Sequence, residues 1–451
     1  MTVVDQYRAT LGASELRARA TGHGVDLARL GVRLALEDGR PTEVLRWAER
    51  ARAGALRRPA VRPPGDNQLA ADLVELRRVR TDLRESALHG AVPRGLTTQA
   101  TRLEEKVRNR TLRASDGRTA DTGRVDVGAV RQALGDRVLV EFVALDRRLH
   151  AVTVRRSGVR FHDLALVAEV EQERQYLMFA LRRLLRPKSR MSAESVVSST
   201  AARLDDLLLA PLRLPADVSV VVVPTGELHG LPWASLPSLA GRPTTVAPSA
   251  ALWLGEGLAG GEAGAEADAG RGRVALVAGP SLPGADAEVR ELATLYPGAT
   301  VLTGERATAA GVLAALERAD LVHLAAHGSF RADSPLFSSV MLADGPLTVY
   351  DLERLSRAPA VVVLSACEAA VAAVHDGDEL LGTAAALLSL GVHSVIAPLL
   401  PVPDHATTAV MVALHHLLLA GCRPAEALAA AGAGQDRAAA SAFVCIGRDD
   451  P

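Results

Sequence analysis

Two reactive side chains follow short apolar segments of the sequence, 40 positions apart. His327 follows the apolar run 321–326, and Cys367 follows the run 361–366. Runs that are apolar throughout are typical of strands buried on both faces of a parallel sheet. Such sheets bind ligands at the carboxyl ends of their strands. A histidine and a cysteine at neighbouring strand ends can share a proton, which produces a thiolate nucleophile.

Gly328 directly follows the histidine. Because glycine has no Cβ, its backbone N–H can approach a substrate carbonyl closely and act as an oxyanion donor. Both reactive residues also have a structural interpretation, since a single cysteine or histidine at the end of a buried strand is commonly an inert core residue. Their order and matched placement favour the catalytic interpretation. His323, two residues before the end of the same strand, either orients His327 or is a hydrogen-bonded core histidine.

The elements that must position these residues belong to an α/β fold. After residue 272 strands and helices alternate, which predicts a doubly wound parallel sheet with right-handed crossovers. Upstream, a β-hairpin and two helices precede a short apolar strand. The predicted strands are 138–145, 149–154, 218–223, 273–279, 299–302, 320–326, 360–366 and 394–398, and the predicted helices are 164–185, 192–209, 285–296, 308–318, 379–390 and 405–419.

The N-terminal region is helical by its pattern. Apolar residues recur at helical spacing, and a turn at 38–41 separates two helices; the segment 27–56 is similar to one tetratricopeptide (TPR) unit. One such unit cannot bury its own apolar face, so we expect Leu34, Leu45 and Trp47 to lie against an apolar surface. A further helix is predicted over 69–88. Residues 1–120 carry a net charge of +8, but no aromatic residues accompany the arginines, and the pattern favours a solvated helix surface over nucleic-acid binding.

Composition excludes several other classes of protein. The net charge is −1, and three cysteines are too few for a disulfide framework, which favours a reducing cytoplasm. The N-terminus lacks the apolar core of a signal peptide, and the apolar window 380–400 reads as a buried helix and strand, so no membrane association is expected. The glycine-rich segment 255–260 follows no good strand, and no cofactor is expected. No metal site is expected either, because His375, His393 and His405 lack metal-ligand spacing.

The two strand-end motifs resemble the CHAT family, caspase-like cysteine peptidases that are often joined to TPR repeats and are related to caspases and separases. The family has histidine upstream of cysteine, as caspases do, although the local caspase signature is absent around Cys367. Within the intervening LTVYDL segment, Thr348 and Asp351 have the spacing of a helix capping box. The matching stretches are 323–328 (HLAAHG), 347–352 (LTVYDL) and 364–368 (LSACE), with further similarity at 223–233, 377–382, 401–404 and 442–447.

The resemblance implies caspase-like doubly wound sheets in two lobes, which an all-α segment precedes in the sequence. The expected division is a TPR-like helical hairpin over 1–57, a helical linker region over 58–124, a lobe without a dyad over 125–255 and a catalytic lobe over 272–451. This sequence departs from the family at two places near the expected site. Ala369-Ala370 stands where the family usually has Thr-Gly, and Leu400 where it usually has Trp.

The resemblance also assigns roles. Cys367 is the nucleophile, His327 the general base and acid, and the backbone N–H groups of Gly328 and Cys367 form the oxyanion hole. Ser365 lies where caspases have a residue of the primary pocket. Asp404 either lines that pocket or caps the helix that follows it. The pocket is therefore expected to prefer a basic or an apolar residue, and not an acidic one, before the scissile bond.

The sequence thus predicts a cytoplasmic cysteine endopeptidase that cleaves a partner protein, with the N-terminal helices as the docking site of a regulatory protein. The abundance of Arg, Ala, Gly and Leu is typical of a GC-rich bacterial genome. Two alternatives remain: a catalytically silent caspase-like scaffold or adaptor, and a thiol hydrolase that acts on a small amide. No nucleic-acid or membrane partner is expected.

Overall fold

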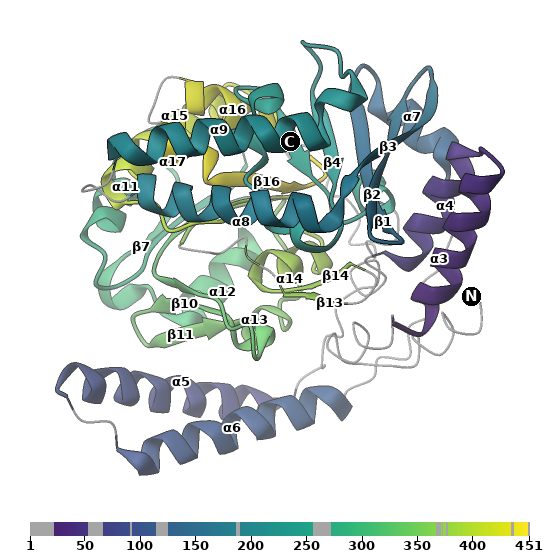
Figure 1. Cartoon of the computed structure of the whole chain (residues 1–451). Helices are drawn as coiled ribbons and strands as arrows, with labels where there is room; N and C mark the ends of the chain where they lie inside the picture. The colour runs from purple at the N-terminus through teal and green to yellow at the C-terminus, as the bar shows by residue number, and fades with distance from the viewer. Residues whose placement is uncertain are drawn as a thin grey trace.

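An 11-stranded mixed sheet runs through the computed structural model of the chain (Figure 1). The structure describes residues 22–52, 66–90, 93–113, 125–185, 190–255, 272–366, 371, 373–375, 378–433 and 437–449. The order of the strands across the sheet is β3-β2-β1-β4-β5-β16-β15-β12-β8-β6-β7. The fold is therefore α/β, as the sequence predicts.

The first five strands in this order come from the N-terminal half of the α/β region. The predicted hairpin is confirmed, but a third antiparallel strand, β3, occupies 158–166, so the helix predicted to begin at 164 begins at Val167 instead. In β3 every third residue is exposed and none is fully buried, as a strand at the edge of the sheet permits. These strands are β1 (Val138–Leu145), β2 (Arg148–Arg155), β3 (Gly158–Leu166), β4 (Val220–Val223) and β5 (Thr244–Val246).

The other six strands form the C-terminal half of the sheet. All are parallel to their neighbours except β16, which pairs antiparallel with β15. On its other side β16 pairs parallel with β5, where Cys445 lies opposite Thr245 and Ile446 opposite Val246. This pairing joins the two halves into one continuous sheet. These strands are β6 (Val274–Ala278), β7 (Thr300–Leu302), β8 (Leu321–Ala325), β12 (Val361–Ser365), β15 (Ser394–Pro398) and β16 (Phe443–Gly447).

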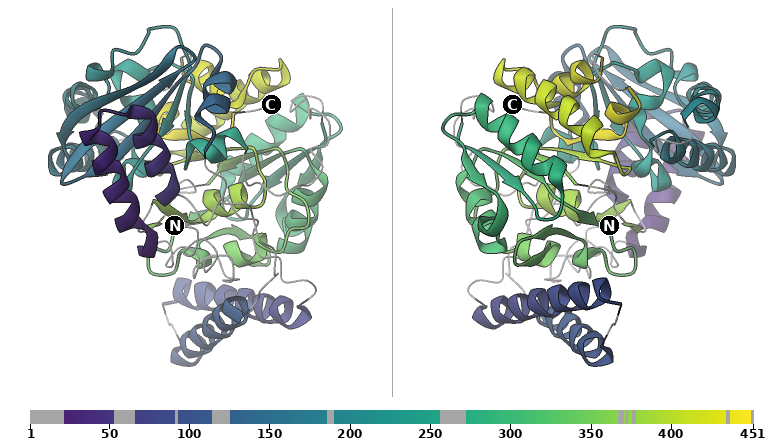
Figure 2. Two further views of the ribbon diagram at one scale, coloured as in Figure 1. Left: turned by 90° about the vertical axis from the view of Figure 1, so that its right-hand side faces the viewer. Right: turned by 90° about the vertical axis from the view of Figure 1, so that its left-hand side faces the viewer.

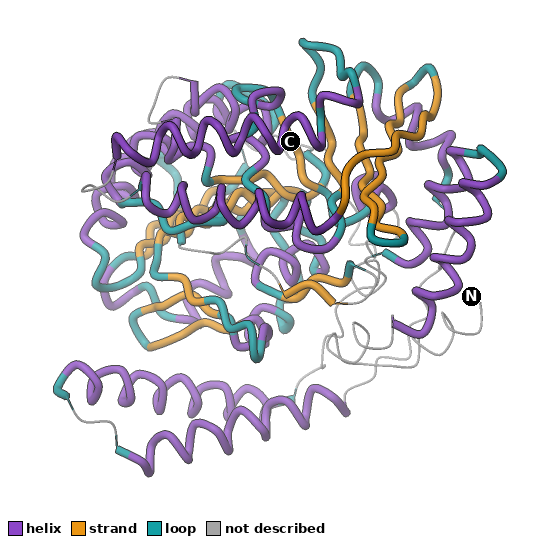
Figure 3. The backbone as a smooth tube through the Cα atoms, viewed as in Figure 1, coloured by secondary structure: helices purple, strands orange, loops and turns teal. Residues whose placement is uncertain are grey.

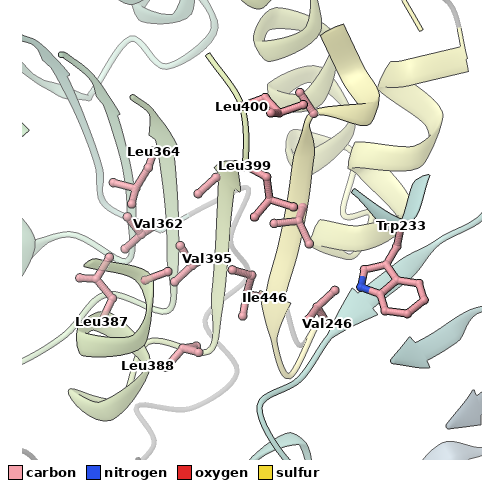
Figure 4. Close-up of a cluster of buried hydrophobic side chains, with 14 of the residues drawn as sticks. Trp233, Val246, Val362, Leu364, Leu387, Leu388, Val395, Leu399, Leu400 and Ile446 are labelled. Atoms are coloured by element: carbon pink, nitrogen blue, oxygen red, sulfur yellow. The ribbon is translucent and has the colours of Figure 1, made fainter. Parts of the chain in front are cut away.

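Helices cover both faces of the sheet. Because side chains alternate along a strand, Val362 and Leu364 face one helical layer, while Val361 and Val363 face the other. Figure 4 shows Val362, Leu364 and Val395 near Leu387 and Leu388 of the first layer. That layer contains α8 (Val167–Leu184), α9 (Arg190–Leu208), α12 (Ala309–Arg318) and α14 (Thr383–Ser389), and the opposite layer contains α7 (Val127–Leu134), α10 (Ala250–Leu254), α11 (Pro283–Leu295), α15 (Asp404–Leu419) and α16 (Pro424–Ala433).

Smaller elements follow the strand ends. The segment 379–390, predicted as one helix, begins as strand β14, and its helix starts only at Thr383. A three-stranded sheet follows β8, and its last strand leads into α13, whose capping box of Thr348 and Asp351 is present as predicted. The elements are β9 (Gly328–Ser329), β10 (Ser339–Leu342), β11 (Gly345–Thr348), α13 (Val349–Leu352), β13 (Ala373–His375), β14 (Glu379–Leu381) and α17 (Arg437–Ser441).

The first N-terminal helical pair, α3 (Gly22–Glu37) and α4 (Pro41–Ala51), lies against β1–β3 (Figure 2). Leu45 is buried as predicted, and Trp47 is half-buried. The prediction for Leu34 is wrong, because its side chain is 52% exposed. Small residues on the other face of α3 allow α4 to approach closely, and a Cβ at Gly31 would overlap the Trp47 ring. The leucine stripe of α3 therefore faces outward.

A second helical pair, α5 (Asn67–Leu88) and α6 (Arg94–Arg113), packs on the three-stranded sheet and α13. Figure 3 shows this second pair outside the layers that cover the main sheet. Arg77 of α5 is buried, and its guanidinium donates to the Asp351 carboxylate at 2.8 Å. Asp351 also accepts from the backbone N–H of Thr348, so the cap of α13 and the position of α5 depend on the same carboxylate.

Candidate active site

The two strands that precede His327 and Cys367 are neighbours in the sheet. β8 and β12 pair in parallel from Leu321 opposite Val361 to Ala325 opposite Ser365. His327 follows Ala325 by two positions, and Cys367 follows Ser365 by two positions. Cys367 itself lies outside the described residues, as do Ala369 and Ala370.

His327 lies at the surface where β8 leaves the main sheet. Its Nε2 is 3.1 Å from the carbonyl oxygen of Ser281. Because a carbonyl oxygen can only accept, this contact assigns the ring proton to Nε2 and leaves Nδ1 as the basic nitrogen. The ring therefore has a fixed orientation and one nitrogen able to take a proton.

The loop that supplies this carbonyl is held in a constrained conformation. Ser281 has φ of +59°, a left-handed conformation that costs a non-glycine residue about 1–2 kcal/mol. Gly279, at the start of the loop, passes so close to the neighbouring strands that a Cβ there would lie 2.6 Å from the Ala326 Cβ and 2.7 Å from the Met341 carbonyl oxygen. The close approach brings the loop from β6 to α11 next to His327.

The chain after His327 enters the three-stranded sheet. The backbone N–H of Met341 donates to the His327 carbonyl at 2.8 Å, and Gly328 lies opposite Val340 in the ladder of β9 and β10. The backbone on which we expect an oxyanion donor is therefore anchored by strand pairing. Arg331, farther along, contacts Glu104 of α6 at 2.8 Å, which ties this segment to the second helical pair.

A cavity of about 80 Å³ adjoins His327 at the ends of β8 and β12. Ser365 lines it, as the sequence predicts for a pocket residue, and its walls include Ala326, Leu282 and Val402. Glu288 of α11 also lines it, and its side chain is 3% exposed. The cavity is therefore largely apolar, with one carboxylate in its lining.

Asp404 is the first residue of α15, and its side chain lies outside the described part of the structure. The N-cap position of α15 is Pro403. The helix therefore begins one residue earlier than the sequence predicts, and both roles of Asp404, in the pocket and at the start of the helix, stay predictions. Leu400, where the family usually has Trp, is fully buried after β15.

His323 is a hydrogen-bonded core histidine. Its Nε2 lies 2.9 Å from Glu288 Oε1, and its Nδ1 lies 3.1 Å from His415 Nε2. Both ring nitrogens are thus engaged with residues of α11 and α15. The same-strand spacing that suggested an orienting role for His323 instead directs the side chain towards the helical layer on the α11 face.

The segment that follows Cys367 is tied to α4 by buried charges. Asp378 accepts from Thr225 Oγ1 at 2.8 Å and from the Gly226 N–H at 2.6 Å, and its carboxylate lies 3.3 Å from the Arg52 guanidinium. Arg52 also donates to the Phe142 carbonyl at 2.6 Å and lies 3.7 Å from Glu141. Burial, followed by the proximity of Glu49, raises the pKa of Glu141 well above its usual range.

The described residues contain no group of three or more His, Cys, Asp or Glu side chains that could hold a metal ion. No described helix is both long and apolar enough to cross a membrane. The glycine-rich segment 256–260 lies outside the described residues, as does His375 apart from its place in β13.

Sequence reasoning missed Ser281, Gly279 and Glu288. Ser281 acts through a backbone carbonyl, which carries no residue-specific signal. Gly279 is the last residue of a predicted strand, and a glycine there is a recognisable signal for close backbone approach. Glu288 reads as an ordinary helix residue, and only the tertiary structure brings it to the cavity.

Comparison with known proteins places the chain in a family and relates its fold to solved structures. A family model described as the CHAT domain matches residues 198–435, more than half of the chain. No curated protein matches the sequence. A chain in a crystal structure of the Saccharomyces cerevisiae separase–securin complex has a TM-score of 0.56 at 10% identity, covering 91% of this chain and 34% of its own length. A second structure of that complex gives 0.50 at 9% identity, with 96% and 37% covered. This chain therefore shares a fold with about a third of those chains.

Proposed function

The chain belongs to the CHAT-domain family, and from this premise we propose that it is a cysteine endopeptidase that cleaves a partner protein through a dyad of His327 and Cys367. The family and the separase-like fold support a caspase-like peptidase. Protein cleavage by this chain and its target are parts of the proposal.

The register of β8 and β12 is the observation that carries the proposal. The last paired residues, Ala325 and Ser365, lie opposite each other, and neighbouring strands are about 4.8 Å apart. His327 follows Ala325, and Cys367 follows Ser365, by two positions in the sequence. This equal spacing favours a proton exchange between the histidine and the cysteine at this edge of the sheet.

The proposed reaction uses Nδ1 of His327 as the base. Nδ1 takes the proton of the Cys367 thiol, and the thiolate attacks the scissile carbonyl to form a tetrahedral oxyanion, which the N–H groups of Gly328 and Cys367 stabilise. The imidazolium then gives its proton to the leaving amine, and the C–N bond breaks. Water, deprotonated by the same nitrogen, hydrolyses the thioester and restores the thiol. The Ser281 carbonyl keeps Nε2 protonated throughout.

Labelling by a thiol-reactive peptide electrophile tests the nucleophile. Cys367→Ala should abolish labelling and peptide cleavage. The matched control is Cys422→Ala, because Cys422 is half-buried, whereas Cys445 is buried and burial raises the pKa of its thiol. Wild-type labelling should survive this control. His327→Ala should reduce cleavage by at least on the order of 100-fold, and wild-type turnover in either dyad variant would refute the assignment.

The second candidate function is a catalytically silent scaffold. It is favoured by Ala369-Ala370, where the family usually has Thr-Gly, and by Leu400 in place of Trp. Absence of both Cys367-dependent labelling and cleavage, in a protein that still binds a partner, would support it. Candidate partners and substrates are the proteins encoded by neighbouring genes, and incubation with them reveals either cleavage or binding.

The outward face of α3 supports the docking of a regulatory protein on the N-terminal helices. Leu27, Leu30 and Leu34 are 48%, 48% and 52% exposed and follow one another at helical spacing. Exposed leucines in a row are typical of a surface that packs on another protein. The Arg- and Ala-rich composition supports a bacterial source, and the low cysteine content supports a reducing cytoplasm.

A further inference from the structure

The cavity beside His327 has a carboxylate in its lining. Glu288 of α11 lies on one wall, and Ser365 and His327 lie at the strand ends. Most of the remaining lining is apolar, including Leu282, Ala326 and Val402. Among its described lining residues, Glu288 is the only acidic one.

Glu288 is the end of a buried chain of hydrogen bonds. Tyr296 Oη lies 3.0 Å from His415 Nδ1, His415 Nε2 lies 3.1 Å from His323 Nδ1, and His323 Nε2 lies 2.9 Å from Glu288 Oε1. His323 and His415 are fully buried, so these three side chains connect the carboxylate to the interior between α11 and α15.

The direction of these hydrogen bonds is set where His323 meets Glu288, because a carboxylate oxygen accepts and His323 Nε2–H donates to it. At the other end, Tyr296 Oη also donates to the backbone carbonyl of His415 at 3.4 Å. Burial, and next the nearby His323, lowers the pKa of His415 well below its usual value, which favours the neutral His415 ring. The hydrogen bond from His323 fixes the position of the Glu288 carboxylate.

This arrangement places one carboxylate in the cavity lining beside the proposed dyad. A cationic side chain in the cavity would pair with that carboxylate, whereas an acidic side chain would be repelled by it. The methylene groups of lysine or arginine would pack on the apolar walls. The cavity is therefore complementary to a basic side chain.

We propose that Glu288 is the specificity-determining residue of the primary pocket and selects arginine or lysine immediately before the scissile bond. This inference rests on the proposed endopeptidase function and makes it more specific. It assigns the pocket charge to a residue of α11, whereas the sequence alone suggested Asp404.

A positional peptide library, varied only before the scissile bond, provides the test. The wild-type protein should cleave after Arg or Lys in preference to Leu. Glu288→Gln keeps the size of the side chain and an oxygen for His323, but removes the charge. The Arg-to-Leu ratio of kcat/KM should fall about 10- to 100-fold in this variant, as expected for the loss of a charge-assisted hydrogen bond.

Two controls separate charge from structure. Tyr296→Phe removes the hydroxyl at the far end of the hydrogen-bond chain but leaves the Glu288 side chain in place, so the Arg-to-Leu ratio should persist. Asp404→Asn tests the other carboxylate considered for the pocket, and the ratio should also persist there. A ratio that falls with Asp404→Asn and not with Glu288→Gln would overturn the proposal.

The wild-type profile keeps the proposal testable if Glu288→Gln does not fold. Cys367-dependent cleavage after Leu or Asp, with no preference for Arg or Lys, would refute the role of Glu288 while the endopeptidase function stands. Absence of any Cys367-dependent cleavage or electrophile labelling would refute the endopeptidase function, and the pocket assignment with it.

Discussion

Replacing Arg52 by methionine tests how the N-terminal helices are joined to the α/β body. The Arg52 side chain is 3% exposed and donates to the backbone carbonyls of Phe142 and Pro224. It also pairs with the carboxylates of Asp378 and Glu141. Methionine fills similar volume but leaves these acceptors without their cation.

The expected loss is large. Removing one partner of a buried ion pair costs about 3–5 kcal/mol, because the remaining charge stays desolvated. Total stabilities of folded domains are about 5–15 kcal/mol. Arg52→Met should therefore remove a substantial fraction of the free energy of unfolding.

Urea unfolding followed by tryptophan fluorescence measures this loss. The three tryptophans lie at 47, 233 and 253, in or beside the elements that Arg52 joins. The single variant Glu141→Gln and the double variant Arg52→Met/Glu141→Gln complete a double-mutant cycle. The losses of the two single variants should depart from additivity by about 0.5–3 kcal/mol, because the two side chains lie 3.7 Å apart in a buried site. The control is Arg33→Met, which removes an exposed pair with Asp146 and should leave the midpoint unchanged.

Two outcomes would refute the reasoning. A loss below about 1 kcal/mol for Arg52→Met would mean that the pairing of these buried groups contributes little to the fold. Strict additivity of the two substitutions would mean that Arg52 and Glu141 do not interact, despite their separation of 3.7 Å.

Three further predictions concern the loop, the pH dependence and the helices. Proline cannot adopt the positive φ of Ser281, so Ser281→Pro should displace the carbonyl that contacts His327. This displacement should lower kcat/KM on the order of 100-fold. Ser281→Asn should retain activity, because asparagine tolerates that conformation. Burial lowers the pKa of His229 from 6.5 to about 4, so the unfolded chain binds a proton at this residue more readily than the folded chain does. As the pH falls from above 6.5 to 4, roughly 3 kcal/mol of the free energy of unfolding should therefore be lost. His229→Asn should flatten this part of the dependence of stability on pH. Leu45→Ala should cost about 2–5 kcal/mol in urea unfolding because Leu45 is fully buried, whereas Leu30→Ala should change stability by less than about 0.5 kcal/mol.

The central strands of the fold could be predicted from the sequence because their signal is local. β8, β12 and β15 are short apolar runs buried on both faces, and the structure has them within a residue or two of the predicted bounds. β3 was not predicted because its residues are half-buried or exposed, so they merge with the start of α8. In α6, Ala100, Leu103 and Val107 are buried at helical spacing, a signal diluted by the many charged residues between them.

The leucines of α3 show why a correct helix can have a wrongly assigned face. Leu27, Leu30 and Leu34 form the more apolar stripe, yet Val25, Ala28, Val32 and Ala35 are the buried side chains. Close contact with α4 requires small residues, and the Trp47 ring lies over Gly31. Hydrophobicity alone does not reveal this steric requirement, which depends on the partner helix.

Some residues of the candidate site could likewise be predicted from the sequence, and others could not. His327, Gly328 and Ser365 were predictable because they follow recognisable strands. The Ser281 carbonyl and the Glu288 carboxylate were not, since the loop from β6 to α11 and the helix α11 bring them to the site through tertiary packing. Their contribution depends on a positive φ at one residue and on a buried hydrogen-bond chain that spans 127 positions, from Glu288 to His415.

Each N-terminal helical pair contacts a segment that follows one of the two proposed dyad residues. Arg52, the residue after α4, pairs with Asp378, in the segment after Cys367. Arg77 of α5 and Glu104 of α6 bind Asp351 and Arg331, after His327. Deletion of residues 1–57 would therefore remove a buried cation and uncover the apolar surface under Leu45, in addition to any docking site on α3. For this reason a truncated chain with altered activity does not by itself demonstrate regulation. Substitution of the exposed leucines, which leaves both sets of contacts in place, isolates the effect of a docked partner.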